Sequence, residues 1–210
     1  KEEYIKENTA KKIPKPRLPQ KIPKHLNIDH TERLLDWAKQ YPYIYSYEKN
    51  RAVAIMAMFI YTGIRYKELL HLKLEDIDFE NNIVHVLAGK GSKDRNIPLS
   101  PTLKGYLKPY LVERNKINPY SLYFFVSKRS HGKMSDKTLR RLIEKLKTKS
   151  KIHFTPHMLR HTFATLMLEG GCDIFSLSKM MGHSNIKTTT IYLTATVSHL
   201  QHQISKHPLQ

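Results

Sequence analysis

The chain has 210 residues, of which 40% are hydrophobic, and it carries 36 Lys and Arg against 18 Asp and Glu. This length supports one domain with a buried core. Its single cysteine, Cys172, excludes a disulfide framework and a cysteine-rich zinc site within the chain, and fits a reducing cytosol. No apolar run approaches the length of a membrane span.

The formal net charge of +18 indicates a polyanionic partner, and nucleic acid is the first candidate. The alternative is a basic surface that binds nothing. The uneven distribution of charge favours nucleic acid. Residues 9–25 hold six Lys and Arg and no acid, residues 128–151 hold ten against Asp136 and Glu144, and no acidic residue follows Asp173.

The first 65 residues predict an arm followed by two helices. Residues 1–25 read as a basic arm or linker, because four prolines interrupt any helix. Asp29 and Glu32 have the spacing of a capping box and predict a helix through Lys39. Residues 51–61 are strongly apolar and predict a buried helix, which the Thr62-Gly63 pair ends.

The rest of the chain predicts one small sheet among helices. A helix restarts over residues 64–72, and residues 82–99 then change to a two-residue period. They predict a β-hairpin with strands at 83–87 and 95–99 and a glycine-bearing loop at 89–94. Residues 122–126 fit a short strand or an extended turn. Further helices are expected at 102–115, 135–148, 157–168, 173–181, 187–194 and 196–206. The expected fold class is mainly α with a small antiparallel β-sheet (α+β).

The last 55 residues hold an inventory suited to one reaction. His157, Arg160, His183 and Tyr192 supply imidazoles, a guanidinium and a phenol, and Arg65 lies upstream, three residues before a glutamate. A phenol has an ordinary pKa of about 10, so roughly one in a thousand is ionised at pH 7. It needs a proton acceptor to attack a phosphodiester, and the phosphate needs cationic clamps. The alternative interpretations are surface salt bridges for the arginines, structural hydrogen bonds for the histidines and a packed ring for the tyrosine.

Four segments together resemble the tyrosine recombinases, the family of phage integrases and Xer-type enzymes. Residues 62–69 resemble the first catalytic-arginine motif, 89–99 the catalytic-lysine hairpin, 155–165 the His-x-x-Arg box, and 181–192 the second-histidine and nucleophile segment. Their order fits the family, as do the gaps of 23 positions from Arg160 to His183 and 9 from His183 to Tyr192. Any one motif would be weak, but together they cover most of the chain.

The resemblance implies a tyrosine-recombinase catalytic-domain fold over residues 26–210, preceded by the linker at 1–25. The N-terminal DNA-clamping domain of the family is absent from this chain, so we expect a fragment of a longer protein. The helix at 196–206 is expected to pack either on its own domain or on a neighbouring protomer, as in the family.

The resemblance also assigns catalytic roles. Arg65 and Arg160 would clamp the scissile phosphate. Tyr192 would attack it, giving a 3′-phosphotyrosine and a free 5′-hydroxyl. His157 would accept the phenolic proton or bond the phosphate, and His183 would contact a non-bridging oxygen.

Three further roles are expected around this site. Lys90 would protonate the leaving 5′-oxygen, with Lys93 as the rival general acid. Glu68 would orient Arg65. His161 would be a structural or supporting residue packed under the site.

Lys93 would otherwise contact DNA phosphates, and DNA contacts are also expected from Arg95, Lys137, Arg140 and Arg141. No metal ion, ATP or other cofactor is expected. The expected partners are double-stranded DNA and further copies of the chain, in a tetrameric synapse on DNA, and no membrane is expected. The resemblance implies a cytoplasmic protein, bacterial and nucleoid-associated or encoded by a mobile element.

The expected function is site-specific recombination through a Holliday junction. Two alternatives stay open. One is DNA relaxation like that of a type IB topoisomerase, which uses similar chemistry on one duplex. The other is a non-catalytic DNA-binding protein on the same fold. The sequence does not choose between chromosome dimer resolution, integration and transposition.

Overall fold

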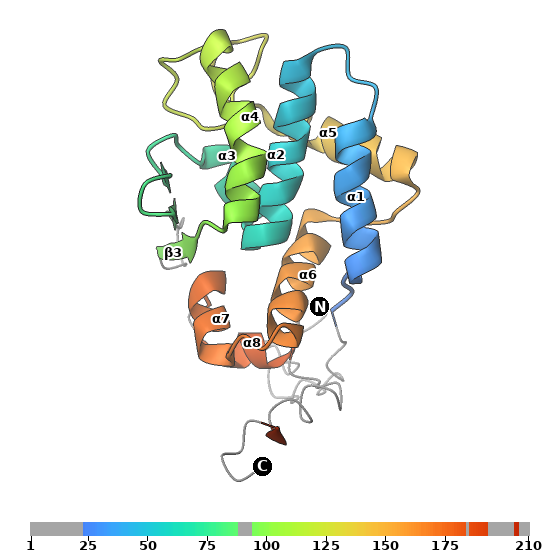
Figure 1. The fold of residues 1–210 in the computed structure, drawn as a ribbon, viewed down its shortest axis with the longest axis vertical. Coiled ribbons are helices and arrows are strands. Elements are labelled where there is room, and N and C mark those ends of the chain that lie inside the picture. Colours follow the sequence, from blue (N-terminus) through green and yellow to red (C-terminus); the bar gives the residue numbers. More distant parts are fainter. Residues whose placement is uncertain (1–22, 88–93, 184, 193–203, 206–210) are drawn as a thin grey trace, which may run out of the picture.

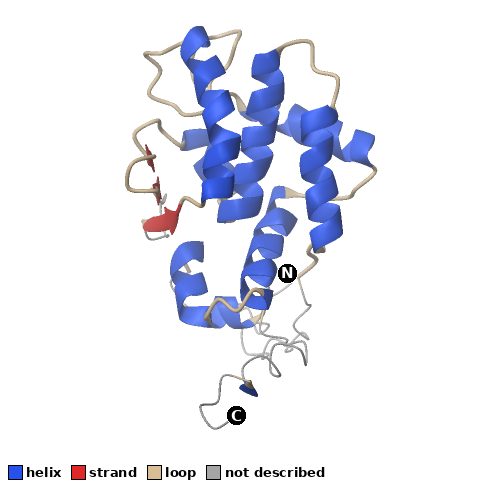
Figure 2. Cartoon of the chain, in the orientation of Figure 1, coloured by secondary structure: helices blue, strands red, loops and turns tan. Residues whose placement is uncertain are grey.

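A computed structural model describes residues 23–87, 94–183, 185–192 and 204–205 of the chain. These residues form a mainly helical domain with one small sheet, as expected (Figures 1 and 2). The elements, in order, are α1 (Ile28–Gln40), α2 (Ser46–Thr62), α3 (Tyr66–His71), β1 (Ile77–Asp78), β2 (Ile83–Val86), β3 (Arg95–Pro98), α4 (Pro101–Ile117), α5 (Asp136–Ser150), α6 (Pro156–Glu169), α7 (Ile174–Met181) and α8 (Lys187–Thr190).

Helix α2 forms the centre of the core. Every residue from Ala52 to Ile60 is buried, so this helix is apolar on all sides, as expected for one surrounded by other elements. It packs against α1, α4 and α6. The predicted helix at 51–61 is therefore confirmed, and it begins five residues earlier than expected, at Ser46.

The predicted N-cap of α1 is wrong by two residues. Asn27, not Asp29, is the N-cap residue, and its side chain accepts a hydrogen bond from the backbone N–H of His30 at 2.8 Å. Asp29 lies in the first turn and forms an exposed ion pair with Arg33. An asparagine two residues earlier takes the role, because its short side chain reaches the free N–H groups of the first turn.

The sheet has three antiparallel strands in the order β1-β2-β3. The predicted hairpin is confirmed as β2 and β3, with Val84 opposite Ile97 and Val86 opposite Arg95. The sequence missed β1, which has only two residues. Most of the predicted hairpin loop lies outside the described residues. Residues 122–126 form no named strand and pair only through the isolated bridges Lys73–Tyr123 and Val126–Lys133.

Helices α6, α7 and α8 gather at the lower end of the molecule in Figure 1, below α2 and α4. Phe163, Leu168, Leu177 and Met181 bury a second, smaller apolar cluster there, with Tyr192 packed against it. Helix α8 ends at Thr190, four residues before the predicted end. The predicted helix at 196–206 lies almost entirely outside the described residues. No helix in the described part of the chain is long and apolar enough to cross a lipid bilayer.

Candidate active site

The connection between α2 and α3 places Arg65. Gly63 ends α2 in the left-handed conformation (φ 58°), with its N–H bonded to the carbonyl of Phe59. Arg65 is the N-cap residue of α3, and its backbone N–H donates to Oε2 of Glu68 at 2.8 Å. The side chain of Arg65 stays 35% exposed, so its guanidinium is accessible. Glu68 bonds both the backbone N–H and the guanidinium of Arg65 in this geometry.

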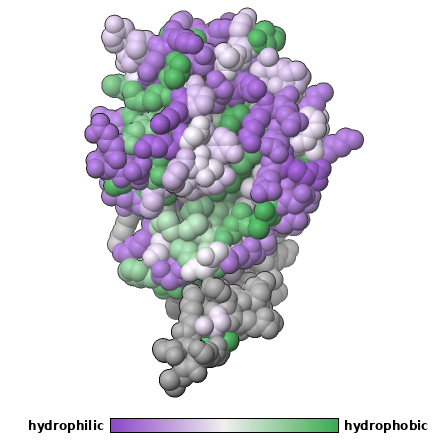
Figure 3. Space-filling view, in the orientation of Figure 1, coloured by the Kyte–Doolittle hydropathy of each residue, from purple (hydrophilic) through white to green (hydrophobic). Residues whose placement is uncertain are grey.

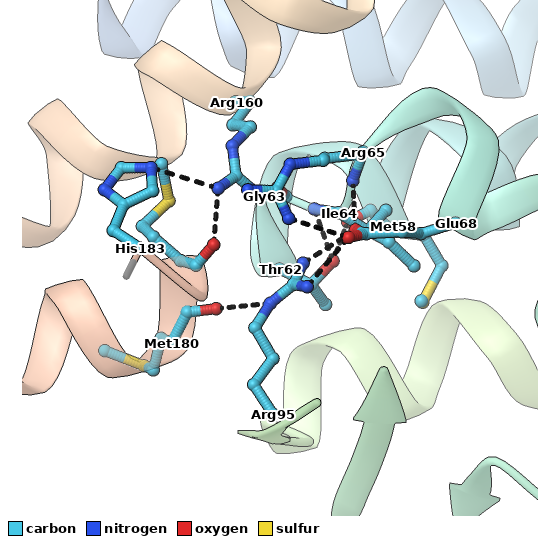
Figure 4. A network of polar contacts seen from close by, with 11 residues as sticks. Met58, Thr62, Gly63, Ile64, Arg65, Glu68, Arg95, Arg160, Met180 and His183 are labelled. Atoms are coloured by element: carbon cyan, nitrogen blue, oxygen red, sulfur yellow. Dashed lines mark hydrogen bonds and ion pairs between the residues drawn. The ribbon is translucent and has the colours of Figure 1, made fainter. Parts of the chain in front are cut away.

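Glu68 is a buried carboxylate held by two arginines (Figure 4). Its Oε1 accepts from Nη1 of Arg65 at 2.8 Å and Nη1 of Arg95 at 2.9 Å, and its Oε2 accepts from Nη2 of Arg95 at 2.8 Å. Burial alone would raise the pKa of this carboxyl, but the hydrogen bonds and charge of Arg95, and then the hydrogen bonds of Arg65, outweigh it and lower the pKa to about 2. Glu68 is therefore ionised at neutral pH.

Arg160 extends from α6 into the same region and is buried. Its Nη1 donates to the carbonyl of Gly63 at 2.6 Å, and its Nη2 donates to the carbonyl of Met181. Burial, together with the positive charges of Arg65 and Arg95, lowers its pKa to about 10, so it stays charged at pH 7. Arg160 thus ties the end of α2 to the end of α7.

His183 follows α7 directly. Gly182 ends that helix in the left-handed conformation (φ 64°). The Nε2 atom of His183 lies 3.3 Å from Nη2 of Arg160, and its Nδ1 lies 2.8 Å from Oγ1 of Thr189. Burial and then the charge of Arg160 lower the pKa of His183 to about 4. At pH 7 this imidazole is neutral.

Tyr192 contacts His161, which was expected to be a structural or supporting residue. Its hydroxyl lies 2.6 Å from Nδ1 of His161. Burial raises the pKa of the phenol, and the charge of Arg160 partly opposes this. Burial and then the charge of His157 lower the pKa of His161 to about 4. The phenol is therefore protonated at pH 7, and the neutral imidazole can accept its hydrogen bond.

The other predicted site residues are distributed as follows. His157 is exposed, and its ring lies against that of His161 with centroids 4.3 Å apart. Lys90 and Lys93 lie outside the described residues. Lys137, Arg140 and Arg141 are exposed on the first turns of α5, where Arg140 pairs with Asp136 at 2.6 Å.

The expectation that Arg95 contacts DNA does not fit its position. Its side chain is 3% exposed, and its guanidinium is bonded to Glu68 and to the carbonyl of Met180. An arginine can be buried in this way because the carboxylate compensates its charge. The sequence also missed Thr189, whose hydroxyl contacts His183. Thr189 is buried within a run of three threonines, and its sequence position alone does not distinguish it.

The site thus brings together two guanidiniums, two neutral imidazoles and a phenol. They come from the start of α3, from α6, from the turn after α7 and from the segment after α8. No group of three or more His, Cys, Asp or Glu among the described residues is arranged to hold a metal ion. Cationic forks can bind the oxygens of a phosphate, and a phenol beside an imidazole is a potential nucleophile. The arrangement is suited to the class of enzyme that transfers a phosphodiester to a tyrosine.

Comparisons with known proteins agree with this class. The sequence model of the phage integrase family matches residues 24–199. Tyrosine recombinase XerA of Pyrococcus horikoshii is 38% identical over 205 residues, which are 97% of this chain and 68% of that protein. A crystal structure of XerA recombinase aligns with a TM-score of 0.74 and 34% identity, over 90% of this chain and 67% of that one. XerH site-specific recombinase in a post-cleavage complex with palindromic difH aligns with a TM-score of 0.72 and 26% identity, over 89% and 54%.

The chain therefore belongs to the phage integrase family. It is a tyrosine recombinase of the Xer type, an enzyme of site-specific recombination that breaks and rejoins DNA. It spans about two thirds of the length of the XerA relatives it matches.

Proposed function

We propose that Tyr192 attacks a DNA phosphodiester held by Arg65 and Arg160, and that strands are exchanged at paired sites through a Holliday junction. The convergence of these groups carries the proposal. The accessible guanidinium of Arg65 is fixed at the start of α3, while Arg160 joins the ends of α2 and α7 beside His183. Together they form a cationic cluster near the half-buried phenol of Tyr192.

The two arginines stabilise the charge that develops on the phosphate oxygens. Planar guanidiniums bind such oxygens through two parallel N–H groups, and groups already oriented need no reorganisation during the reaction. Arg160 is held by two carbonyls and Arg65 by one carboxylate, so both are oriented before DNA binds. His183, neutral at pH 7, adds a hydrogen bond to a non-bridging oxygen.

In the cleavage step the Tyr192 oxygen bonds to phosphorus and the bond from phosphorus to the 5′-oxygen breaks. The phenolic proton goes to an imidazole. His161 is the first acceptor, because its Nδ1 already lies 2.6 Å from the hydroxyl, and His157 is the alternative that the family resemblance suggests. A developing phenolate raises the basicity of a neighbouring imidazole, which offsets its low resting pKa.

The leaving 5′-oxygen takes a proton from Lys90, with Lys93 as the rival donor. A positioned acid of this kind contributes about 10²–10⁴ in rate. The product is a 3′-phosphotyrosine and a free 5′-hydroxyl. The phosphodiester energy is retained in that ester, so the reverse attack by a 5′-hydroxyl rejoins the strand without ATP.

The substrate is duplex DNA, and the partners are further copies of the chain in a tetrameric synapse. The exposed cations Lys137, Arg140 and Arg141 on α5 are accessible for phosphate contacts. A bacterial or mobile-element protein of this kind acts in the cytoplasm, at the nucleoid. Neither DNA relaxation on one duplex nor DNA binding without cleavage is favoured, because the relatives are recombinases and the chain keeps the tyrosine and both arginines.

Covalent capture on DNA tests the proposal. A duplex with a site selected by the protein from a randomised pool, carrying a bridging phosphorothiolate, should trap a 3′-phosphoryl adduct on Tyr192 without added metal. Tyr192→Phe should retain DNA binding and form no adduct. Tyr106→Phe is the matched control, since Tyr106 packs on Tyr61 and is not one of the site residues described above. An adduct that persists in Tyr192→Phe would show that another residue is the nucleophile.

A further inference from the structure

The side chain of Arg95 is placed to hold other residues of the protein rather than to contact DNA. It begins β3, and its guanidinium is directed inward (Figure 4). The Nη1 and Nη2 groups bind the two oxygens of Glu68 at 2.9 and 2.8 Å, and Nε donates to the carbonyl of Met180 at 2.8 Å. With 3% of its side chain exposed, Arg95 does not present its guanidinium at the surface.

The first group that Arg95 fixes is Glu68. Each oxygen of this carboxylate accepts from both arginines: Oε1 from Nη1 of Arg65 and Nη1 of Arg95, and Oε2 from the backbone N–H of Arg65 and Nη2 of Arg95. A carboxylate with four donors has one orientation. Since Arg65 is held only through this carboxylate among its described side-chain hydrogen bonds, the orientation of Arg65 depends on Arg95.

The second group is the end of α7. The last carbonyls of a helix lack intrahelical partners, and cations are favourable there. The carbonyl of Met180 accepts a hydrogen bond from Nε of Arg95, and the carbonyl of Met181 accepts one from Nη2 of Arg160. Two residues beyond Met181, His183 lies 3.3 Å from Arg160. The position of the imidazole therefore depends on how both arginines hold this helix end.

Gly182 shows how close this contact is. A Cβ atom added at Gly182 would lie 2.7 Å from Cδ of Arg95 and 3.3 Å from its Nε. The Met-Gly-His sequence thus needs glycine for its left-handed backbone (φ 64°) and also to make room for Arg95. The packing couples β3 directly to the turn that carries His183.

We propose that Arg95 is a positioning residue that sets Arg65 and His183 relative to each other by linking Glu68 to the end of α7. It does this without contacting DNA. The expected effect of Arg95 on the rate of DNA cleavage rests on the proposed function above. Its expected effect on the positions of His183 and Arg65 does not.

The variants Arg95→Lys and Arg95→Met test this role. Lysine keeps the charge but lacks the planar fork, so it cannot hold both oxygens of Glu68 and the Met180 carbonyl together. Arg114→Met is the matched control. Arg114 is also fully buried and bonds carbonyl oxygens at the other end of the domain, so its loss should lower stability without altering the site.

The first measurement uses DNA. Single-turnover covalent capture is followed on the bridging-phosphorothiolate duplex selected by the wild-type protein, at saturating DNA and normalised to folded protein. A misplacement of about 1 Å can cost about 100-fold in rate. We expect Arg95→Met to lose about 100-fold in capture rate, Arg95→Lys to recover part of it, and both to keep the wild-type Kd for DNA.

The second measurement needs no DNA. Imidazole nitrogen resonances of His183 are compared in ¹⁵N NMR spectra of the free 210-residue proteins. Arg95→Met should shift them, Arg95→Lys should shift them less, and Arg114→Met should leave them in place.

The outcomes separate the two proposals. If the wild-type protein captures no DNA, the proposed function fails, and the NMR comparison still decides whether Arg95 positions His183. A loss of DNA affinity in Arg95→Met with an unchanged capture rate at saturation would overturn the positioning role. So would unchanged His183 resonances, or a capture rate that falls equally in Arg114→Met.

Discussion

At the scale of single residues, Glu68 should contribute to the free energy of unfolding. Its side chain is 8% exposed, and its charge is compensated by Arg65 and Arg95. A buried charge is tolerated only when it is paired and hydrogen-bonded, and removing a partner leaves an uncompensated charge. Glu68 thus links the orientation of Arg65 to the folding of the domain.

The pH dependence of unfolding should report this carboxylate. Its pKa is about 2 in the folded protein and 4.5 ordinarily, so its contribution is present above pH 5 and is lost as pH falls toward 2. The difference corresponds to a free energy of unfolding on the order of 3 kcal/mol. Most of this should disappear between pH 5 and pH 3. Urea unfolding of wild type and Glu68→Gln across this range measures it, and the variant should show the weaker pH dependence.

An exposed carboxylate provides the control for that experiment. Glu144 pairs with Lys147 on the surface of α5 and is 66% exposed. Surface pairs of this kind contribute little. Glu144→Gln should therefore keep the wild-type pH dependence. If Glu68→Gln also keeps it, the carboxylate is not held by the arginines in solution.

At the scale of elements, the turn at the end of α7 is tightly constrained. Gly182 has a φ of 64°, which costs a residue with a side chain about 1–2 kcal/mol, and an added methyl would press on Arg95. Gly182→Ala should lower the free energy of unfolding by about 2 kcal/mol or more. It should also reduce covalent capture, because Arg95 and His183 are displaced together. Urea unfolding and the capture assay measure the two effects.

Gly105, in contrast to Gly182, has room for a side chain. It lies inside α4, and a Cβ added there meets nothing within 4 Å. Alanine at such a position removes backbone freedom from the unfolded chain, so Gly105→Ala should stabilise by about 0.5–1 kcal/mol. Equal effects at Gly105 and Gly182 would contradict the structural account of the α7 turn.

The sequence predicted the elements whose hydrophobic pattern extends over many residues. The apolar run in α2 and the two-residue period of β2 and β3 were read correctly, because both patterns extend over several residues. Strand β1 has two residues and carries no period, so it was missed. The cap of α1 was misplaced because Asn27 and Asp29 offer equivalent side chains, and only the backbone direction decides between them.

For the site, motif spacing identified the segments that converge, but not every role within them. Arg95 was expected to contact DNA, but its side chain faces the protein interior. The alternation of β3 contained the missing signal, since Arg95 lies two positions before the buried Ile97 and so shares its face. The contact between His161 and Tyr192 depends on how α6 packs against the segment after α8, and no local pattern encodes it.

At the scale of the whole molecule, positive charge is spread over surfaces outside the site. The face shown in Figure 3 is largely hydrophilic. A groove between the start of α1 and the connection from α5 to α6 is lined by Lys24, His25, His30, Arg33, Lys151 and His153. Met158 of α6 also lines it, and His25 lies close enough to His161 for its charge to help lower the pKa of that residue, so this basic surface adjoins the candidate site.

Such a surface predicts strongly salt-dependent DNA binding. Each phosphate contact releases counterions, and six to ten contacts would lower affinity by about 10³–10⁵ between 50 and 200 mM salt. Replacing a single contacting cation, as in Lys137→Gln or Arg141→Gln, should reduce the slope of log K against log salt by about 1. Arg114→Met, which removes a buried cation, should leave the slope unchanged. Fluorescence anisotropy with a labelled duplex across this range measures the slope. An affinity that stays flat would mean that the excess charge of +18 serves another purpose than holding DNA.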